Sequence, residues 1–178
     1  ILDLATIEPG HISLERDSID INDLLNSVLV LVHERARQKE LTIECNCSPD
    51  IGAMVADEKR LKKALFNILS NSVKFTLHDG ETIVSARRQG DETILTTSDS
   101  GVGISSADQD RVFAKFEHGT SAEARRSGAG LGLSLVKSFV EMHGGKVALE
   151  SKSEVGTNVI CALPSRAAPS APLPALMT

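Results

Sequence analysis

The sequence contains no tryptophan and no tyrosine, and its aromatic side chains are limited to five phenylalanines. A core without large aromatic residues has to be built from aliphatic side chains, and stacking platforms for nucleic-acid bases are not expected. The formal net charge of -5 also leaves no basic surface for nucleic acid or for an anionic membrane. These absences argue against a nucleic-acid partner.

Long hydrophobic runs are missing as well. No stretch of 18 apolar residues occurs, so nothing in the chain is expected to span a bilayer, and no signal peptide opens it. The sequence begins without methionine, inside an apparent helix, and we therefore expect a fragment of a cytoplasmic domain. Any membrane tether would lie in an N-terminal part that precedes these residues.

Cysteine is scarce, and its three positions lack the CxxC spacing of a typical metal or redox site. Leu41, Ile43, Cys45 and Cys47 stand at every second position, which places both cysteines on the face of one strand that Leu41 and Ile43 share. We expect both to be small core residues rather than metal ligands. An odd cysteine count without a disulfide pattern fits a reducing compartment.

What remains is the composition of one globular domain: 178 residues, 41% hydrophobic and 24% charged. Residues 11–163 are expected to form this domain. Residues 164–178 hold four of the six prolines and are expected to form a disordered tail. Residues 1–10 resemble the end of an amphipathic helix that Pro9 and Gly10 terminate.

Hydrophobic periodicity predicts three long helices and several strands. The first helix follows an N-cap at Asp20, the second follows an N-cap at Asp57, and the third covers 132–143. The residues expected to face inward are Leu24, Leu25, Val28, Leu31 and Val32 in the first helix, Leu61, Ala64, Leu65, Ile68 and Ser72 in the second, and Leu135, Val136, Phe139 and Val140 in the third. Strands are expected around 12–15, at 41–47, just before 56, and at 81–89, 92–98, 146–150 and 157–163. The predicted fold class is α/β: a two-layer α/β sandwich with three helices on one face of a mixed sheet.

The second helix carries a polar stripe beside its apolar face. Asn67, Asn71 and Lys74 stand at i, i+4 and i+7, so they share one side of the helix. Two amides and an ammonium at this spacing can hold a magnesium ion and a triphosphate. An ordinary solvated helix face would show the same residues.

Two glycine-rich segments accompany this stripe. The segment from Asp99 to Ile104 follows a strand and contains Gly101 and Gly103, where a backbone without side chains can approach a flat ligand. The aspartate can accept a hydrogen bond from an exocyclic amine such as that of adenine. Taken alone, this pattern also fits a surface loop.

The other segment, Gly128 to Leu133, opens the third helix with glycines at 128, 130 and 132. Backbone amides at a helix N-terminus bind phosphate. The spacing differs from the dinucleotide-binding G-x-G-x-x-G motif, and no G-x-x-x-x-G-K-[ST] motif is present.

The order of these segments resembles the N, G1, F, G2 and G3 boxes of histidine kinases, within the superfamily of gyrase, Hsp90, histidine kinases and MutL. The F box would be Phe113 to Phe116, and the G3 box Gly156 and Thr157. The resemblance implies the ATP-binding (Bergerat-type) fold of that superfamily and spans residues 57 to 163. It also implies that residues 1–10 are the tail of the dimerisation helix that precedes this domain.

The resemblance implies a role for each matching residue. Asn71 and Asn67 would ligate Mg²⁺, Lys74 would contact the phosphates of ATP, and Asp99 would bind the adenine amine. Residues 114–127 would form a lid over the nucleotide, from which Arg125 or Arg126 could reach the γ-phosphate. The remaining nucleotide contacts would come from Gly101, Gly103, Ile104, Phe116, Gly128, Gly130, Leu131, Gly132, Leu133 and Thr157.

The implied function is the catalytic domain of a two-component sensor histidine kinase. Asn67 stands where ATP-hydrolysing relatives carry a glutamate, which favours transfer to a histidine over hydrolysis. None of the five histidines matches the phosphoacceptor pattern of the family, and all are expected at the surface. The acceptor would lie on a separate dimerisation domain, and a response regulator would be the next partner.

Two alternatives remain at the level of sequence. A nucleotide-binding pseudokinase scaffold would keep the same boxes and regulate another kinase. A serine kinase of the anti-sigma type or a gyrase-class ATPase would not carry a dimerisation-helix remnant.

Overall fold

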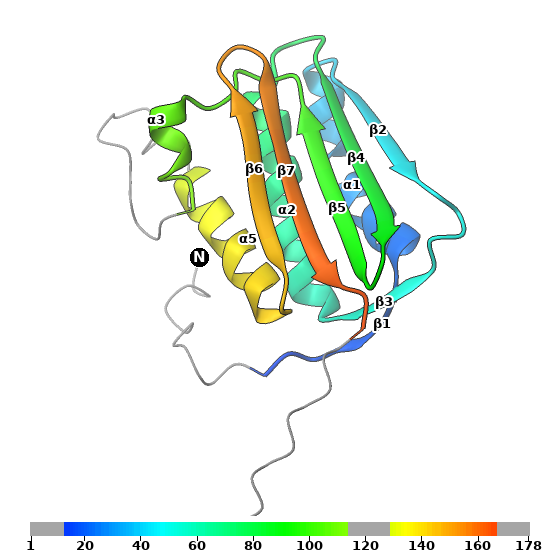
Figure 1. Ribbon diagram of the computed structural model, residues 1–178. Helices are drawn as coiled ribbons and strands as arrows, with labels where there is room; N and C mark the ends of the chain where they lie inside the picture. Colours follow the sequence, from blue (N-terminus) through cyan, green and yellow to red (C-terminus); the bar gives the residue numbers. More distant parts are fainter. Residues whose placement is uncertain (1–12, 114–128, 167–178) are drawn as a thin grey trace, which may run out of the picture.

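The computed structural model describes residues 13–113 and 129–166, with side chains of the second segment from residue 132 onward. Predictions that concern residues 1–12, 114–128 and 167–178 lie outside these ranges. Two layers make up the described part: a five-stranded mixed sheet and, on one of its faces, three long helices (Figure 1). This arrangement confirms the predicted α/β sandwich.

The helical layer consists of α1 (Ile21–Gln38), α2 (Glu58–Phe75) and α5 (Ala129–Met142), with α2 in the middle (Figure 1). Asp20 and Asp57 are the N-caps of α1 and α2, and each carboxylate accepts the backbone N–H three residues later. Both predicted starts are therefore confirmed. The fourth helix of the described chain, α3 (Ser106–Gln109), is a single turn that follows β5.

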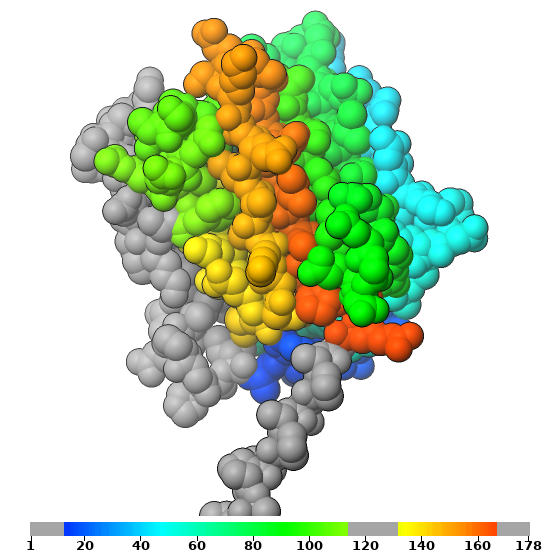
Figure 2. Space-filling model, in the orientation of Figure 1, coloured from blue at the N-terminus to red at the C-terminus, as the bar shows by residue number. Residues whose placement is uncertain are grey.

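The sheet has the order β2-β4-β5-β7-β6, in which the pair β2/β4 is parallel and the other pairs are antiparallel. Its strands are β2 (Thr42–Cys47), β4 (Glu81–Gln89), β5 (Glu92–Asp99), β6 (Lys146–Lys152) and β7 (Gly156–Pro164). A separate antiparallel pair, β1 (Asp17–Asp20) with β3 (Ala53–Ala56), lies beside one end of the sheet. No helix of the described residues covers the outer face of the sheet, which is the face seen in Figure 2.

The core lies between the sheet and the helices and is aliphatic, as the composition predicted. Every residue predicted to face inward from α2 and α5 is buried. One prediction for α1 was wrong: Leu31 is 55% exposed, next to Val30 at 74%. Because α1 lies at the margin of the helical layer, with α2 on one side only, its inward stripe is narrower than the sequence suggested.

Two further predictions need correction. The first strand covers 17–20 rather than 12–15, because it pairs with β3 up to the N-cap of α1. Cys45 is exposed although it shares the inner face of β2 with Cys47, because β2 is an edge strand of the sheet. Two backbone hydrogen bonds lie just beyond residue 163: Ser165 donates its N–H to the carbonyl of Asp91, and its own carbonyl accepts the N–H of Val55.

Among the five histidines, His143 was wrongly predicted to be at the surface. It is 7% exposed and follows α5 directly. Its Nδ1–H donates to the carbonyl of Phe139 at 2.6 Å, and its Nε2 accepts the backbone N–H of Asp57 at 3.0 Å. The last turn of α5 is thereby bonded to the first turn of α2, so these two helices run antiparallel.

Candidate nucleotide-binding site

The predicted site residues gather at one end of the molecule, where α2 ends, α5 begins and β5 meets β7 (upper end in Figure 1). The antiparallel arrangement of α2 and α5 brings the polar stripe of one helix to the N-terminus of the other. Residues 67–74, 99–104, 132 and 157 therefore lie around a single region although they are far apart in sequence.

The stripe on α2 faces the start of α5. Asn67 and Asn71 are half-buried, and a Cβ atom placed on Gly132 would lie 3.3 Å from Nδ2 of Asn71 and 3.8 Å from Cβ of Asn67. The side-chain nitrogen of Asn71 is buried, yet it has no hydrogen-bond partner among the described residues. A buried, unpaired amide is costly, and such groups are found where a ligand completes the bonding.

The first turn of α5 supplies the opposite wall. The first N–H groups of a helix have no partner within the helix, and its N-terminus carries about half a positive charge. Glycine at 132 keeps this turn close to the two asparagines, since any side chain there would press on Asn71. Leu133 is buried, and Gly130 and Leu131 belong to the same turn of backbone.

Lys74 stands at the exposed end of the stripe. Its ammonium lies 5.5 Å from the ring centre of Phe75. A lysine so placed provides a flexible point charge beside the amides of Asn67 and Asn71.

Asp99 forms the other side of the region, at the end of β5. Its Oδ1 accepts the N–H of Gly101 at 2.9 Å, and it also accepts hydrogen bonds from the Ser72 hydroxyl and the Thr157 backbone. Burial raises the pKa of this carboxyl, while these hydrogen bonds lower it in part. A half-buried carboxylate held in a fixed direction is suited to receive a single donor such as an exocyclic amine.

The glycines after Asp99 are required by close backbone contacts. A Cβ on Gly101 would lie 2.8 Å from the carbonyl oxygen of Phe75, at the end of α2. Gly103 has a φ of +69°, and a Cβ there would come within 2.0 Å of the carbonyl oxygen of Lys152. The loop is thus packed between α2 and β6, which supports the reading of a ligand-shaping segment over that of an ordinary surface loop.

Ser151 joins the loop to β7. Its hydroxyl accepts the N–H of Ile104 at 2.8 Å, lies 2.7 Å from the hydroxyl of Thr157, and donates to the carbonyl of Gly156 at 2.9 Å. Thr157 therefore makes two hydrogen bonds at the site: its backbone bonds to Asp99, and its hydroxyl bonds to Ser151. This bonding holds the segments that carry Ile104 and Thr157 together.

Ser72 and Ser151 were not predicted as site residues. Ser72 also bonds to the buried hydroxyl of Thr82 at 2.9 Å. The only signal in the sequence was periodicity, which puts Ser72 on the inner face of α2 and Ser151 in line with Val147 and Leu149. A polar residue at an inward-facing position close to a candidate site indicates a side chain that hydrogen-bonds to the site residues.

Several predicted residues lie outside the described part of the chain, namely Phe116, Arg125, Arg126 and Gly128, together with the lid at 114–127. Phe113, the first phenylalanine of the F box, is half-buried at the end of the described segment.

Comparison with known proteins agrees with this geometry. Residues 56–167 match the model of the family described as histidine kinase-, DNA gyrase B- and HSP90-like ATPase. The chain belongs to this family. The match covers α2, the whole sheet except β2, and α5, which are the elements that carry the site.

Individual relatives of this ATPase domain include two curated proteins. The circadian input-output histidine kinase CikA of Synechococcus elongatus is 36% identical over 169 residues, covering 93% of this chain and 22% of that protein. The sensor protein DivL of Caulobacter vibrioides is 36% identical over 176 residues, covering 99% and 22%. The chain thus spans about a fifth of the length of these relatives.

Solved structures share the fold of the domain. The catalytic domain of the histidine kinase ThkA superimposes with a TM-score of 0.76 at 24% identity, covering 86% of this chain and 97% of that one. Full-length ShkA, solved in complex with AMPPNP, gives a TM-score of 0.75 at 30% identity, covering 91% and 33%. Among the described residues of this ATPase domain, no helix has the length and apolar character of a membrane span.

Proposed function

We propose that this chain is the catalytic domain of a sensor histidine kinase, which binds Mg²⁺-ATP and phosphorylates a histidine on a dimerisation domain. The observation that carries the proposal is the buried, unpaired amide of Asn71, which lies against the N-terminal turn of α5. A phosphate oxygen at this position would accept the hydrogen bond that the amide lacks. The AMPPNP bound to ShkA supports a nucleotide as the ligand.

The donor set of the region fits a magnesium nucleotide. The amide oxygens of Asn67 and Asn71 are hard ligands of the kind that Mg²⁺ prefers, and when bound the ion would neutralise charge on the phosphates. Lys74 and the first-turn amides of α5 would hold the remaining phosphate oxygens. Asp99 would accept the adenine amine and fix the base.

The residues present favour transfer over hydrolysis. Asn67 has no lone pair basic enough to take a proton from water, and an imidazole nucleophile needs no such base. In the transfer, an imidazole nitrogen forms a bond to the γ-phosphorus while the bond from that phosphorus to the bridging oxygen breaks, giving ADP. The imidazole proton leaves to solvent. The chain's own part is to orient ATP and to neutralise its charge.

The partners follow from this reaction. We propose that residues 1–10 are the tail of the dimerisation helix and that residues 11–163 are the catalytic domain, with a short extension to Ser165. The residues beyond are proposed to be a disordered tail. We propose a response regulator as the acceptor of the phosphoryl group from histidine. ThkA, which shares the fold, has been solved in complex with the response regulator protein TrrA. A cytoplasmic location is part of the same proposal.

The experiment is a calorimetric titration of the chain with ATP, with and without Mg²⁺. Wild type should bind, Asp99→Asn should bind at least about 100-fold more weakly, and Asn71→Ala should lose the enhancement by Mg²⁺. Asp79→Asn is the matched control, because it removes the same charge from a side chain that is 78% exposed. Absence of wild-type binding would overturn the proposal.

Transfer is tested separately, by adding γ-labelled ATP and the dimerisation domain of the same protein. Acid-labile phosphate on that domain is the expected product. Binding without any transfer would support a nucleotide-binding scaffold instead.

A further inference from the structure

Lys39 lies at the end of α1, outside the regions that the family motifs cover, yet it makes three bonds to the helix that carries the candidate magnesium ligands. Its Nζ donates to the carbonyl oxygens of Val73 at 2.8 Å, Lys74 at 2.9 Å and Thr76 at 2.7 Å. All three protons of the ammonium are therefore used on the C-terminal turn of α2.

The last four carbonyls of a helix have no partner within the helix, and in α2 each one has an external partner. Ser72 O accepts the N–H and the hydroxyl of Thr76, and Phe75 O accepts the N–H of Val102 at 3.2 Å. Lys39 bonds to the two carbonyls between these, those of Val73 and Lys74. It supplies the positive charge that stabilises a helix C-terminus.

The carbonyl of Phe75 is where α2 meets the glycine loop. It accepts the N–H of Val102 and lies 2.8 Å from the Cβ position of Gly101. Lys39 bonds to the carbonyls on both sides of it, at Lys74 and Thr76. The Phe75 carbonyl, which contacts the loop after Asp99, thus lies between two carbonyls that this ammonium binds.

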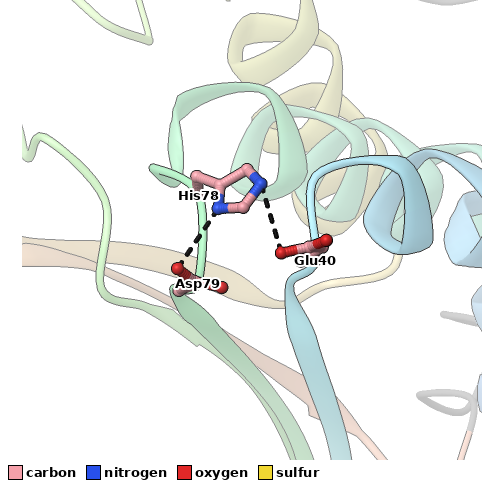
Figure 3. Close-up of side chains that lie close together, drawn as sticks. All are labelled: Glu40, His78 and Asp79. Atoms are coloured by element: carbon pink, nitrogen blue, oxygen red, sulfur yellow. Dashed lines mark ion pairs between the residues drawn. The ribbon is translucent and has the colours of Figure 1, made fainter.

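A second contact bridges the same two turns, and it serves as a comparison. His78 Nε2 lies 3.3 Å from Glu40 and its Nδ1 lies 3.2 Å from Asp79, as Figure 3 shows. These three residues form a group of potential metal ligands in the described chain. Each nitrogen of the His78 ring faces a different carboxylate, however, and a single ion could bind only one of the two ring nitrogens. All three side chains are more than 60% exposed, and such pairs contribute little.

We propose that Lys39 is a positioning residue of the nucleotide site, which fixes the end of α2 so that Lys74 and the Asp99–Gly103 loop hold their relative places. This inference rests on the proposed function. It assigns no contact with the nucleotide to Lys39, whose effect passes through the carbonyls that it binds.

The test compares Lys39→Met, which keeps the length of the side chain without its donors, with Lys39→Arg, which keeps a charged donor. His78→Ala is the matched control at the same two turns. At a temperature where every variant is folded, Lys39→Met should weaken Mg²⁺-ATP binding about 10-fold, Lys39→Arg less than about 3-fold, and His78→Ala less than 2-fold.

Amide hydrogen exchange without nucleotide gives an independent measurement. In Lys39→Met the N–H of Val102 should exchange at least about 10-fold faster than in wild type, and it should be unchanged in His78→Ala. Unchanged affinity and unchanged exchange in Lys39→Met, even with a lower melting temperature, would overturn the inference. Absence of ATP binding by wild type would count against the proposed function, and the Val102 exchange would then decide about Lys39 alone. If Lys39→Met does not fold, Lys39→Gln, which keeps a donor but not the charge, takes its place: affinity and Val102 exchange unchanged from wild type would overturn the inference.

Discussion

Replacing His143 with alanine should lower stability more than any other single change of a histidine in the described part of this chain. The imidazole is buried and both of its nitrogens are bonded, one to the carbonyl of Phe139 and one to the N–H of Asp57. Alanine would leave that N–H buried without an acceptor, which costs about 1–3 kcal/mol, and would remove packing worth about 1–2 kcal/mol. We expect a loss of about 3 kcal/mol in the free energy of unfolding.

Two variants, His143→Gln and His143→Asn, distinguish the contributions of the two hydrogen bonds of the ring. The carbonyl of Phe139 also accepts the backbone N–H of His143 at 3.3 Å, so it keeps a partner when the ring is lost. The N–H of Asp57 has no such reserve. Because the oxygen of glutamine can reach the place of Nε2, whereas asparagine reaches only the place of Nδ1, His143→Gln should be more stable than His143→Asn.

The assay is urea unfolding with thermal melts as a check, where 3 kcal/mol corresponds to about 6–12 °C for a domain of this size. His78→Ala, at a histidine that is 61% exposed, should change stability by less than about 0.5 kcal/mol. A loss below about 1 kcal/mol in His143→Ala would refute the reasoning. An asparagine variant as stable as wild type would do the same.

Other consequences follow from the site itself. Gly103→Ala should lower the free energy of unfolding by about 2 kcal/mol or more and weaken ATP binding, because the φ of Gly103 is +69° and a backbone oxygen lies 2.0 Å from the new Cβ. Gly90→Ala is the control: its φ is +60° but the space around it is open, so the substitution should cost about 1 kcal/mol. Burial raises the pKa of Asp99 in the folded chain above its value in the unfolded chain. Wild type therefore loses stability as the pH rises through this range, because the carboxyl ionises less readily when folded. In urea titrations, the unfolding free energy of Asp99→Asn should increase relative to that of wild type between about pH 3 and pH 7. A thiol reagent should modify Cys45 in the folded chain and leave Cys161 unreacted, because burial raises the pKa of Cys161 to about 12; equal rates for the two would contradict the fold.

The features that could be predicted from sequence are those set by residues close together in the chain. The N-caps Asp20 and Asp57 were predicted because a capping carboxylate and its N–H are three residues apart. The placement of Asn71 on the polar side of α2 followed from helical periodicity in the same way. The strands on either side of Gly90 were predicted to within one residue of their bounds.

Contacts that join distant elements could not be predicted in this way. His143 meets Asp57 across 86 residues, and Lys39 meets the end of α2 across 34 to 37. Nothing near either residue in the sequence marks the partner. The exposure of Cys45 depended on strand order, which decides the edge of the sheet, and alternation along one strand carries no information on that order.

Because α2 and α5 are antiparallel, each end of this helix pair brings the N-terminus of one helix beside the C-terminus of the other, and the polar backbone groups of both need partners. At one end, the start of α2 is capped by Asp57, whose pKa burial would raise but which the N–H groups of Arg60 and Glu15 and the Arg60 guanidinium hold below its usual value. The C-terminal end of α5 lies beside it and is bonded to it through the His143 ring, which pairs the Phe139 carbonyl and the Asp57 N–H.

At the other end, the start of α5 is attractive to an anion, whereas the end of α2 beside it carries the opposite partial charge. A triphosphate could be held by the first only if the second were compensated. Lys39 provides this compensation at the carbonyls of Val73 and Lys74, and the N–H of Val102 does so at Phe75. The unpaired amide of Asn71 lies between these two helix ends. The described contacts thus pair the polar groups at one end of the layer, whereas at the other end the amide of Asn71 lacks a partner among the described residues.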